Sequence, residues 1–190
     1  MLASAVEVLR ERGAAGVTID EVLARSKAPR GSVYHHFPGG RNQLLIEALQ
    51  FAGDSMTSAI DDAASEGPMA LLHRFVDLWE EVLQDSDFAA GCPVVAAAIS
   101  TADEPRLSAD AAGIFERWRT ALTRSFEADG FDGDDAGSLA ITTIAAIEGA
   151  VVLCRSLRSA VPLREVTDQL EFLINGKKFV SRYGRPVVAQ

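Results

Sequence analysis

Apolar side chains recur at intervals of three and four residues along almost the whole chain of 190 residues. This spacing places them on one face of an α-helix, and no convincing run alternates β-branched with polar residues as a half-buried strand does. The sequence therefore predicts an all-α fold. Its expected helices cover residues 2–13, 19–26, 29–36, 44–60, 68–83, 105–126, 136–156 and 162–175, with a short helix of small residues after Pro93.

Local start and stop signals divide these helices. Thr18, followed three residues later by Glu21, has the pattern of a capping box at a helix start. Gly13 and Gly176 are expected to end the first and the last helix. The residues after Gly176 are basic and carry no apolar stripe. We expect a small three-helix domain over residues 1–43, a larger helical domain over 44–176 and a basic C-terminal tail over 177–190.

Charge is distributed unevenly, although the net charge is −9. Residues 1–50 carry six Lys/Arg and five Asp/Glu, whereas residues 51–190 carry twelve and twenty-two. From Arg25 through Arg41 there are four basic residues and no acidic one. An acidic body with one local basic segment fits a protein that meets phosphate at one place only.

The sequence also excludes several classes of protein. The N-terminus has no signal-peptide pattern, and charges interrupt the apolar stretches before they reach a membrane-spanning length. A cytoplasmic protein without a membrane partner is expected. Catalytic motifs are missing and the three histidines lack metal-ligand spacing, so neither an enzyme, a metal site nor a cofactor is predicted. Cys92 and Cys154 are expected to be buried structural thiols.

The three N-terminal helices have the lengths and tight turn of a helix-turn-helix that lays its recognition helix in the major groove of DNA. In that recognition helix Val33 and Phe37 form the buried side, and the opposite side is polar. The candidate DNA-binding residues are Thr18, Arg30, Gly31, Ser32, Tyr34, His35, His36 and Arg41. The alternative for Tyr34 is a packing role, and the alternative for His36 is that it caps the following helix. For the whole basic segment, the alternative is an ordinary solvated surface.

The segment TIDEVLARSKAPRGSVYHHFPGGRNQLLIEAL resembles the DNA-binding domain of the TetR/AcrR family of bacterial transcriptional regulators. Residues 91–93 and the segment AIEGAVVLCRSLRSAVPLREVTDQL resemble the LmrA/YxaF-like branch of that family. The resemblance implies DNA binding, with Arg41 standing where the family usually has a lysine against phosphate. Members usually carry a basic arm before the first helix. Met1 lies almost inside that helix here, so either the arm is lost or the start is truncated.

The resemblance also implies an apolar effector cavity between the middle helices, although any one aromatic residue there is as readily explained by the core. The expected lining is Phe75, Trp79, Phe88, Cys92, Phe115, Trp118, Thr143, Ile144 and Glu148. Because a buried carboxylate needs a partner, Glu148 is expected to pair with Arg155 or Arg119. Recognition of a cationic ligand by Glu148 is the alternative.

Residues 136–156 are apolar on nearly every side and must be covered on every side. With the next helix they are expected to form a homodimer interface, which includes Ala145, Gly149, Val152, Leu170 and Leu173. The sequence thus predicts a ligand-responsive transcriptional regulator. By the family's usual arrangement it is a repressor, released from a pseudo-palindromic double-stranded operator by a small apolar or aromatic effector. A helical enzyme or a pure dimerisation module on the same fold is the alternative.

Overall fold

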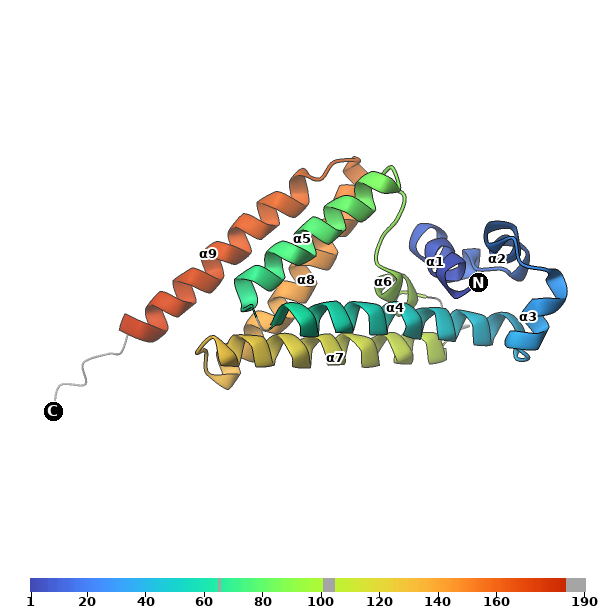
Figure 1. The fold of residues 1–190 in the computed structure, drawn as a ribbon. Coiled ribbons are helices and arrows are strands. Elements are labelled where there is room, and N and C mark those ends of the chain that lie inside the picture. The colour runs from blue at the N-terminus through green and yellow to red at the C-terminus, as the bar shows by residue number, and fades with distance from the viewer. Residues whose placement is uncertain (65, 101–104, 184–190) are drawn as a thin grey trace.

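The computed structural model describes residues 1–64, 66–100 and 105–183. Within these ranges the chain forms nine α-helices and no strand, which confirms the all-α prediction. The helices are α1 (Leu2–Gly16), α2 (Ile19–Ser26), α3 (Arg30–His36), α4 (Gly40–Ala64), α5 (Pro68–Asp85), α6 (Pro93–Ala98), α7 (Pro105–Ala128), α8 (Gly133–Leu157) and α9 (Val161–Tyr183). Figure 1 shows a small head of α1–α3 at one end and a larger body of long helices at the other.

The head is organised by local signals in the sequence. The backbone amide of Glu21 donates to the Thr18 hydroxyl at 3.2 Å, so Thr18 caps α2 as predicted. The reciprocal half of the capping box does not form, because the Glu21 carboxylate instead pairs with Arg25. Gly13 was expected to end the first helix. It marks a kink at φ 71° instead, and the helical segment continues to Gly16.

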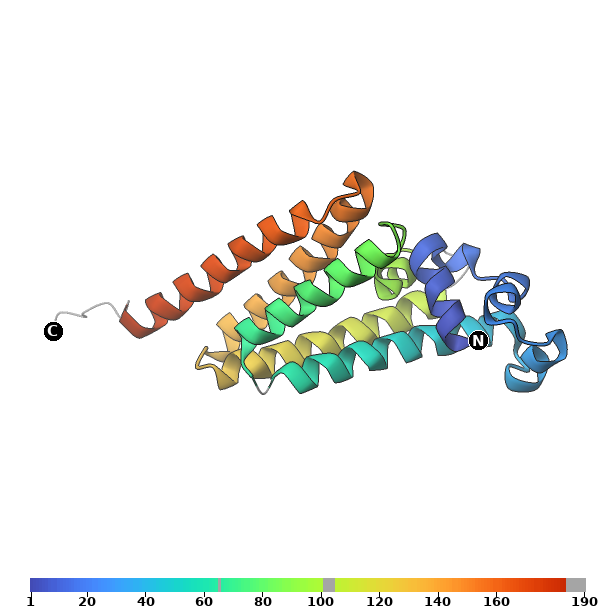
Figure 2. The ribbon, with the colours of Figure 1, turned by 45° about the horizontal axis from the view of Figure 1, so that its top comes forward.

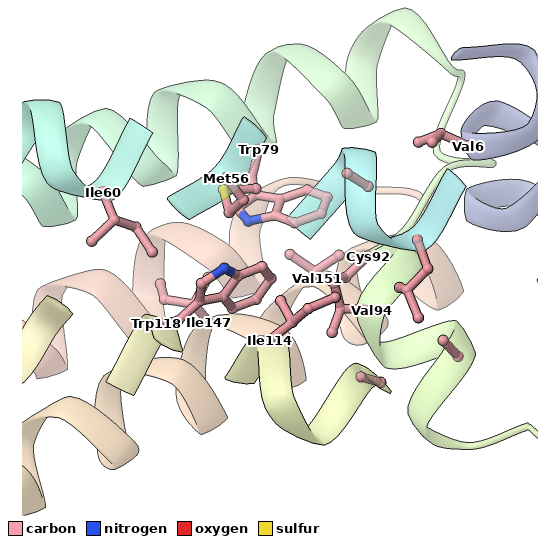
Figure 3. Close-up of a cluster of buried hydrophobic side chains, with 14 of the residues drawn as sticks. Val6, Met56, Ile60, Trp79, Cys92, Val94, Ile114, Trp118, Ile147 and Val151 are labelled. Atoms are coloured by element: carbon pink, nitrogen blue, oxygen red, sulfur yellow. The ribbon is translucent and has the colours of Figure 1, made fainter. Parts of the chain in front are cut away.

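The body is built on two long helices, α4 and α7, which lie side by side in both views (Figures 1 and 2). They approach closely at Gly53, where an added Cβ would lie 2.7 Å from the Ile114 side chain. Around this contact lies the main core, which includes Met56, Trp79 and Trp118 (Figure 3). Head and body are therefore joined through one continuous helix, because α4 begins in the head and ends in this core.

Helix α8 is buried on one side only. Its inner side includes Leu139, Ile147 and Val151, and it packs against α7 and α9. Its outer side exposes Ile141, Val152, Leu153 and Leu157. The mean hydropathy of α8 over an 18-residue window is 1.8. By length and composition alone, this helix is long and apolar enough to cross a membrane. The expectation that no stretch approaches that length is therefore wrong for α8, although it is a packed helix of the body.

Helix α9 continues past Gly176, so the prediction that this glycine ends the helix is wrong. Lys177 pairs with Asp135, and Lys178 pairs with Asp129 at 2.7 Å. These ion pairs reach back 42 and 49 residues along the chain and hold the last turns of α9 against the body. The basic segment expected as a tail over 177–190 is thus helical as far as Tyr183, and residues 184–190 lie outside the described part of the chain.

Candidate DNA-binding face and effector cavity

The recognition helix α3 is fixed on one side and open on the other. Val33 is fully buried and Phe37 is 5% exposed, so both anchor α3 in the core of the head. Arg30, Tyr34 and His35 lie on the exposed side, with Tyr34 57% exposed. Gly31, His36 and Thr18 are also exposed. Apart from Ser32 and Arg41, the predicted DNA-binding residues are therefore exposed and accessible from solvent.

Ser32 and Arg41 are partly buried and bound within the head. The Ser32 hydroxyl donates to the carbonyl of Pro29 at 2.6 Å. The Arg41 guanidinium donates to the carbonyls of Val17 and Ala14, each at 2.7 Å. Arg41 thus ties the end of α1 to the beginning of α4 and positions the segment that precedes α2. A phosphate contact by Arg41 stays a prediction.

Two further arginines of the basic segment are paired with acids. Arg30 contacts Asp20 at 2.8 Å, but both side chains are mostly exposed, so this pair is easily exchanged for a phosphate. Arg25 lies between Glu11 and Glu21, at 2.7 and 3.0 Å, and its hydrogen bonds lower the pKa of both carboxyl groups. This cluster locks α1 to α2. Glu21 and Arg25 lie one turn apart in α2, but Glu11 lies in α1, so sequence spacing alone did not indicate the whole cluster.

A small apolar cavity of about 20 Å³ lies between α4, α5, α7 and α8. Five of the nine predicted effector residues line it, together with Ile60, Leu71, Leu72, Leu122 and Ile147. Those five are Phe75, Trp118, Thr143, Ile144 and Glu148. The volume is close to that of a single water molecule, so a larger ligand would have to displace the lining side chains.

The other four predicted effector residues do not line this cavity. Trp79 is 1% exposed within the core, and Phe115 packs edge-on against Trp118 with ring centroids 5.4 Å apart. Phe88 lies in the loop after α5 at a φ of 59°, and Cys92 faces a different cleft. For these four a place in the effector pocket stays a prediction, because helical periodicity identifies inward positions without showing which of them border a space.

Four buried polar atoms around this core have no hydrogen-bond partner among the described residues. They are Nε1 of Trp79, Nε1 of Trp118, Oγ1 of Thr143 and Oε2 of Glu148. Figure 3 shows the two indole nitrogens turned toward the space between the rings. Buried polar groups are almost always paired in folded proteins, so these four atoms call for partners, which ordered water or a bound molecule can supply.

Glu148 is the buried acid of this region, and the expectation that it pairs with an arginine is wrong. Arg155 donates to the carbonyls of Ala89 and Glu11, and Arg119 pairs with Glu116. Burial therefore raises the pKa of Glu148 to about 7, and a hydrogen bond with Cys92 offsets only part of the effect. Burial also raises the pKa of the Cys92 thiol well above its usual value, as expected for an unreactive structural thiol.

A larger cleft of about 490 Å³ lies between α1, α6 and α8, where the head meets the body. Its walls are residues 10–15 of α1, the segment from Gly91 to Ser100 around α6, and four residues of α8. The α8 residues are Glu148, Val151, Val152 and Arg155. Glu148 borders both this cleft and the apolar cavity. No sequence signal indicated the cleft, because three distant segments form it.

The predicted dimer residues differ in accessibility. Ala145, Gly149 and Val152 are exposed on the outer side of α8, and Leu173 is half-buried on α9. Leu170 is 4% exposed and packs in the core of the single chain, and its assignment to the interface stays a prediction. The residues Phe172, Phe179, Val180 and Tyr183 are instead the exposed large hydrophobic residues on α9 beyond Leu170.

Two family models match the chain in consecutive parts. Residues 1–48 match the model described as bacterial regulatory proteins, tetR family. Residues 68–169 match the model described as transcriptional regulator LmrA/YxaF-like, C-terminal domain. The chain belongs to the TetR family of bacterial transcriptional regulators. This confirms the sequence-based resemblance, the helix-turn-helix fold and the assignment to DNA-binding regulators rather than enzymes.

Relatives of the TetR family agree over nearly the full length. The chain is 42% identical over 180 residues to the HTH-type transcriptional regulator Rv0196 of Mycobacterium tuberculosis, covering 92% of each protein. It is 25% identical to LmrA of Bacillus subtilis, covering 92% of this chain and 94% of LmrA. The regulatory protein TetR of Rhodobacter sphaeroides superposes with a TM-score of 0.77 at 26% identity, covering 89% of this chain and 94% of that one.

Proposed function

We propose that this TetR-family regulator acts in the cytoplasm as a homodimeric repressor that leaves its operator when a small, largely apolar effector binds between α4, α5, α7 and α8. The unpaired buried polar atoms around the apolar cavity carry this proposal. An effector that fits them has an apolar body, a donor for the Glu148 carboxyl group and an acceptor for the Thr143 hydroxyl or the indole of Trp118.

The small size of the cavity explains why binding would move the head. Because the cavity holds about 20 Å³, an effector of ordinary size has to spread the helices that line it. One of those helices is α4, which contributes Ile60 to the cavity and begins in the head. A displacement of α4 at Ile60 is passed along one rigid helix to its first turn. The effector then favours one spacing of the two heads over the other.

DNA binding is tested by fluorescence anisotropy with duplexes from the DNA that flanks the coding region. Arg30→Ala and Tyr34→Ala should each weaken binding by about fivefold to a hundredfold, the range for loss of a phosphate or base contact. Arg124→Ala is a matched control for Arg30→Ala, because it removes the same side chain from an exposed position in the body. Unchanged affinity in both head variants would refute docking through the exposed side of α3.

The dimer is proposed from the exposed apolar residues of α8 and α9. Gly149 lies on the outer side of α8, and a Cβ there would meet nothing within 4 Å in a single chain. Gly149→Leu should therefore leave the chain folded but separate the dimer, because the leucine would hold the two copies apart. Gly113→Leu, at an exposed position of α7 where a Cβ would also meet nothing within 4 Å, is the control. Sedimentation equilibrium measures both, and a wild type that is monomeric at micromolar concentration would exclude the proposal.

A further inference from the structure

The cleft between α1, α6 and α8 carries positive charge inside a strongly acidic protein. Arg10 and Arg155 both line it, and neither forms an ion pair with a carboxylate among the residues the structure describes. The Nε of Arg10 is buried and has no hydrogen-bond partner there. Arg155 donates only to the backbone carbonyls of Glu11 and Ala89 among the described residues and passes close to Gly91, where an added Cβ would be 2.7 Å from its Nη1. Neither guanidinium thus has an ion-pair partner in the described part of the chain, although the Glu7 carboxylate attracts Arg10 at longer range.

Two other charged residues of the cleft are already paired with residues outside it. Glu11 is bound by Arg25, and Arg12 contacts Glu21 at 3.3 Å. The hydroxyl of Ser100 and Oε2 of Glu148 are buried in the same walls without partners. The Nε of Arg10 is buried without a partner among the described residues and partial burial lowers the pKa of this guanidinium, so an anionic ligand would supply a partner that is missing.

Other parts of the cleft lining are apolar. Val95 and Ile99 come from the α6 segment and Val151 from α8, and Ile99 is 77% exposed. A volume of about 490 Å³ accommodates a small organic molecule, since ligand sites commonly begin at about 300 Å³. An inorganic anion would leave the apolar wall in contact with water, whereas a molecule with an apolar body and one acidic group would cover it.

We propose that this cleft is a second ligand site, separate from the apolar cavity, and that it takes an organic carboxylate with an apolar body. The carboxylate lies at Arg10 and Arg155, and the apolar body lies against Val95, Ile99 and Val151. The site goes beyond the proposed effector cavity and does not depend on it.

Its position gives such a ligand direct influence over the head. The α1 side of the cleft is the kinked segment from Gly13 to Ala15. The carbonyl of Ala14 in that segment accepts from Arg41 at the start of α4. A ligand that bridges this segment to α6 and α8 therefore fixes the angle between head and body without passing through the apolar cavity.

Three compounds with one apolar body and different head groups test the site on the full-length protein. They are 4-phenylbutyrate, 4-phenylbutylamine and 4-phenylbutanol, measured by isothermal titration calorimetry. We expect 4-phenylbutyrate to bind at least tenfold more tightly than the amine or the alcohol. Arg10→Met should weaken its binding at least tenfold, and Arg124→Met, which removes an exposed arginine of α7, should change it less than twofold.

Two further variants separate the cleft from the apolar cavity. Ala96→Trp fills the cleft and should abolish binding even if Arg10→Met fails to fold, because Ala96 borders only the cleft. Thr143→Leu fills the apolar cavity and should leave binding of 4-phenylbutyrate unchanged. Three outcomes would overturn the proposal. In the first, the wild type fails to bind 4-phenylbutyrate, and in the second it binds the amine equally or more tightly. In the third, Thr143→Leu removes binding of 4-phenylbutyrate while Ala96→Trp retains it.

Because the readout is binding of 4-phenylbutyrate to the protein alone, failure of this second site is distinguishable from failure of the repressor function, which the DNA titrations measure.

Discussion

The carboxyl group of Glu148 should make the stability of the folded chain fall as pH rises. Its Oε2 is buried without a partner, and burial raises its pKa from 4.5 to about 7. Glu148→Gln keeps the shape of the side chain and removes its titration. Comparing the two proteins across pH therefore isolates the cost of ionising this one group in the body of the protein.

The sign and size of the effect follow from the two pKa values. Below pH 4.5 the group is protonated in the folded and the unfolded chain, so it costs nothing. Above pH 7 the folded chain must hold a buried carboxylate that the unfolded chain exposes to water. A pKa raised from 4.5 to about 7 corresponds to about 3 kcal/mol of unfolding free energy, lost progressively between these pH values.

Urea unfolding at pH 5 and pH 8, at one fixed protein concentration, measures this difference. Relative to wild type, Glu148→Gln should gain about 2–3 kcal/mol of stability between pH 5 and pH 8. Glu165→Gln, at an exposed position on α9, is the matched control and should keep the pH dependence of the wild type. If the difference between wild type and Glu148→Gln is the same at both pH values, the group does not titrate as a buried acid and the reasoning is refuted.

Three other substitutions test how the helices are held together. Gly53→Ala should destabilise the protein by about 1–3 kcal/mol in urea unfolding, because the new Cβ would lie 2.7 Å from the fully buried Ile114; a neutral result would contradict the close α4–α7 contact. Thr18→Ala should cost about 1 kcal/mol, seen as a lower Tm, by removing the acceptor for the amide of Glu21; Thr18→Ser should restore most of it. Arg41→Met should speed amide hydrogen exchange in α1 and α2 while leaving α9 unchanged, since two carbonyls lose their donor; unchanged exchange in the head would show that Arg41 does not hold it.

The helices of the head could be predicted closely because residues next to each helix end determine where the helix begins or stops. Thr18 caps α2 from the adjacent position, and Pro29 immediately precedes α3. The same local reasoning failed at Gly176, which is a plausible helix end by residue type. The ion pairs of Lys177 and Lys178 hold α9 in place, and their acidic partners lie in other parts of the chain. No local pattern reports such partners.

The candidate sites were predictable only in part, for a related reason. Periodicity marked Phe75 and Trp118 as inward, and both line the apolar cavity. It marked Trp79 as inward in the same way, although that ring fills the core beside the cavity. In the sequence Arg10 looks like an ordinary surface charge, and Arg155 is a predicted partner of Glu148. That both arginines line one cleft without an ion pair to any described residue becomes visible only when α1, α6 and α8 are brought together.

The two proposed ligand sites both act on the head next to helix α4, and this makes each of them thermodynamically linked to operator binding. The apolar cavity contacts α4 through Ile60, near the end of that helix. The cleft acts on the segment at Ala14, whose carbonyl is held by Arg41 in the first turn of α4. Each ligand therefore favours particular positions of one shared element. Because coupling between binding sites is reciprocal, any factor by which a carboxylate in the cleft changes operator affinity must also be the factor by which the operator changes affinity for that carboxylate. A ligand bound equally well in both head positions would leave the operator affinity unchanged, and the operator would leave the affinity for that ligand unchanged, however tightly the ligand binds.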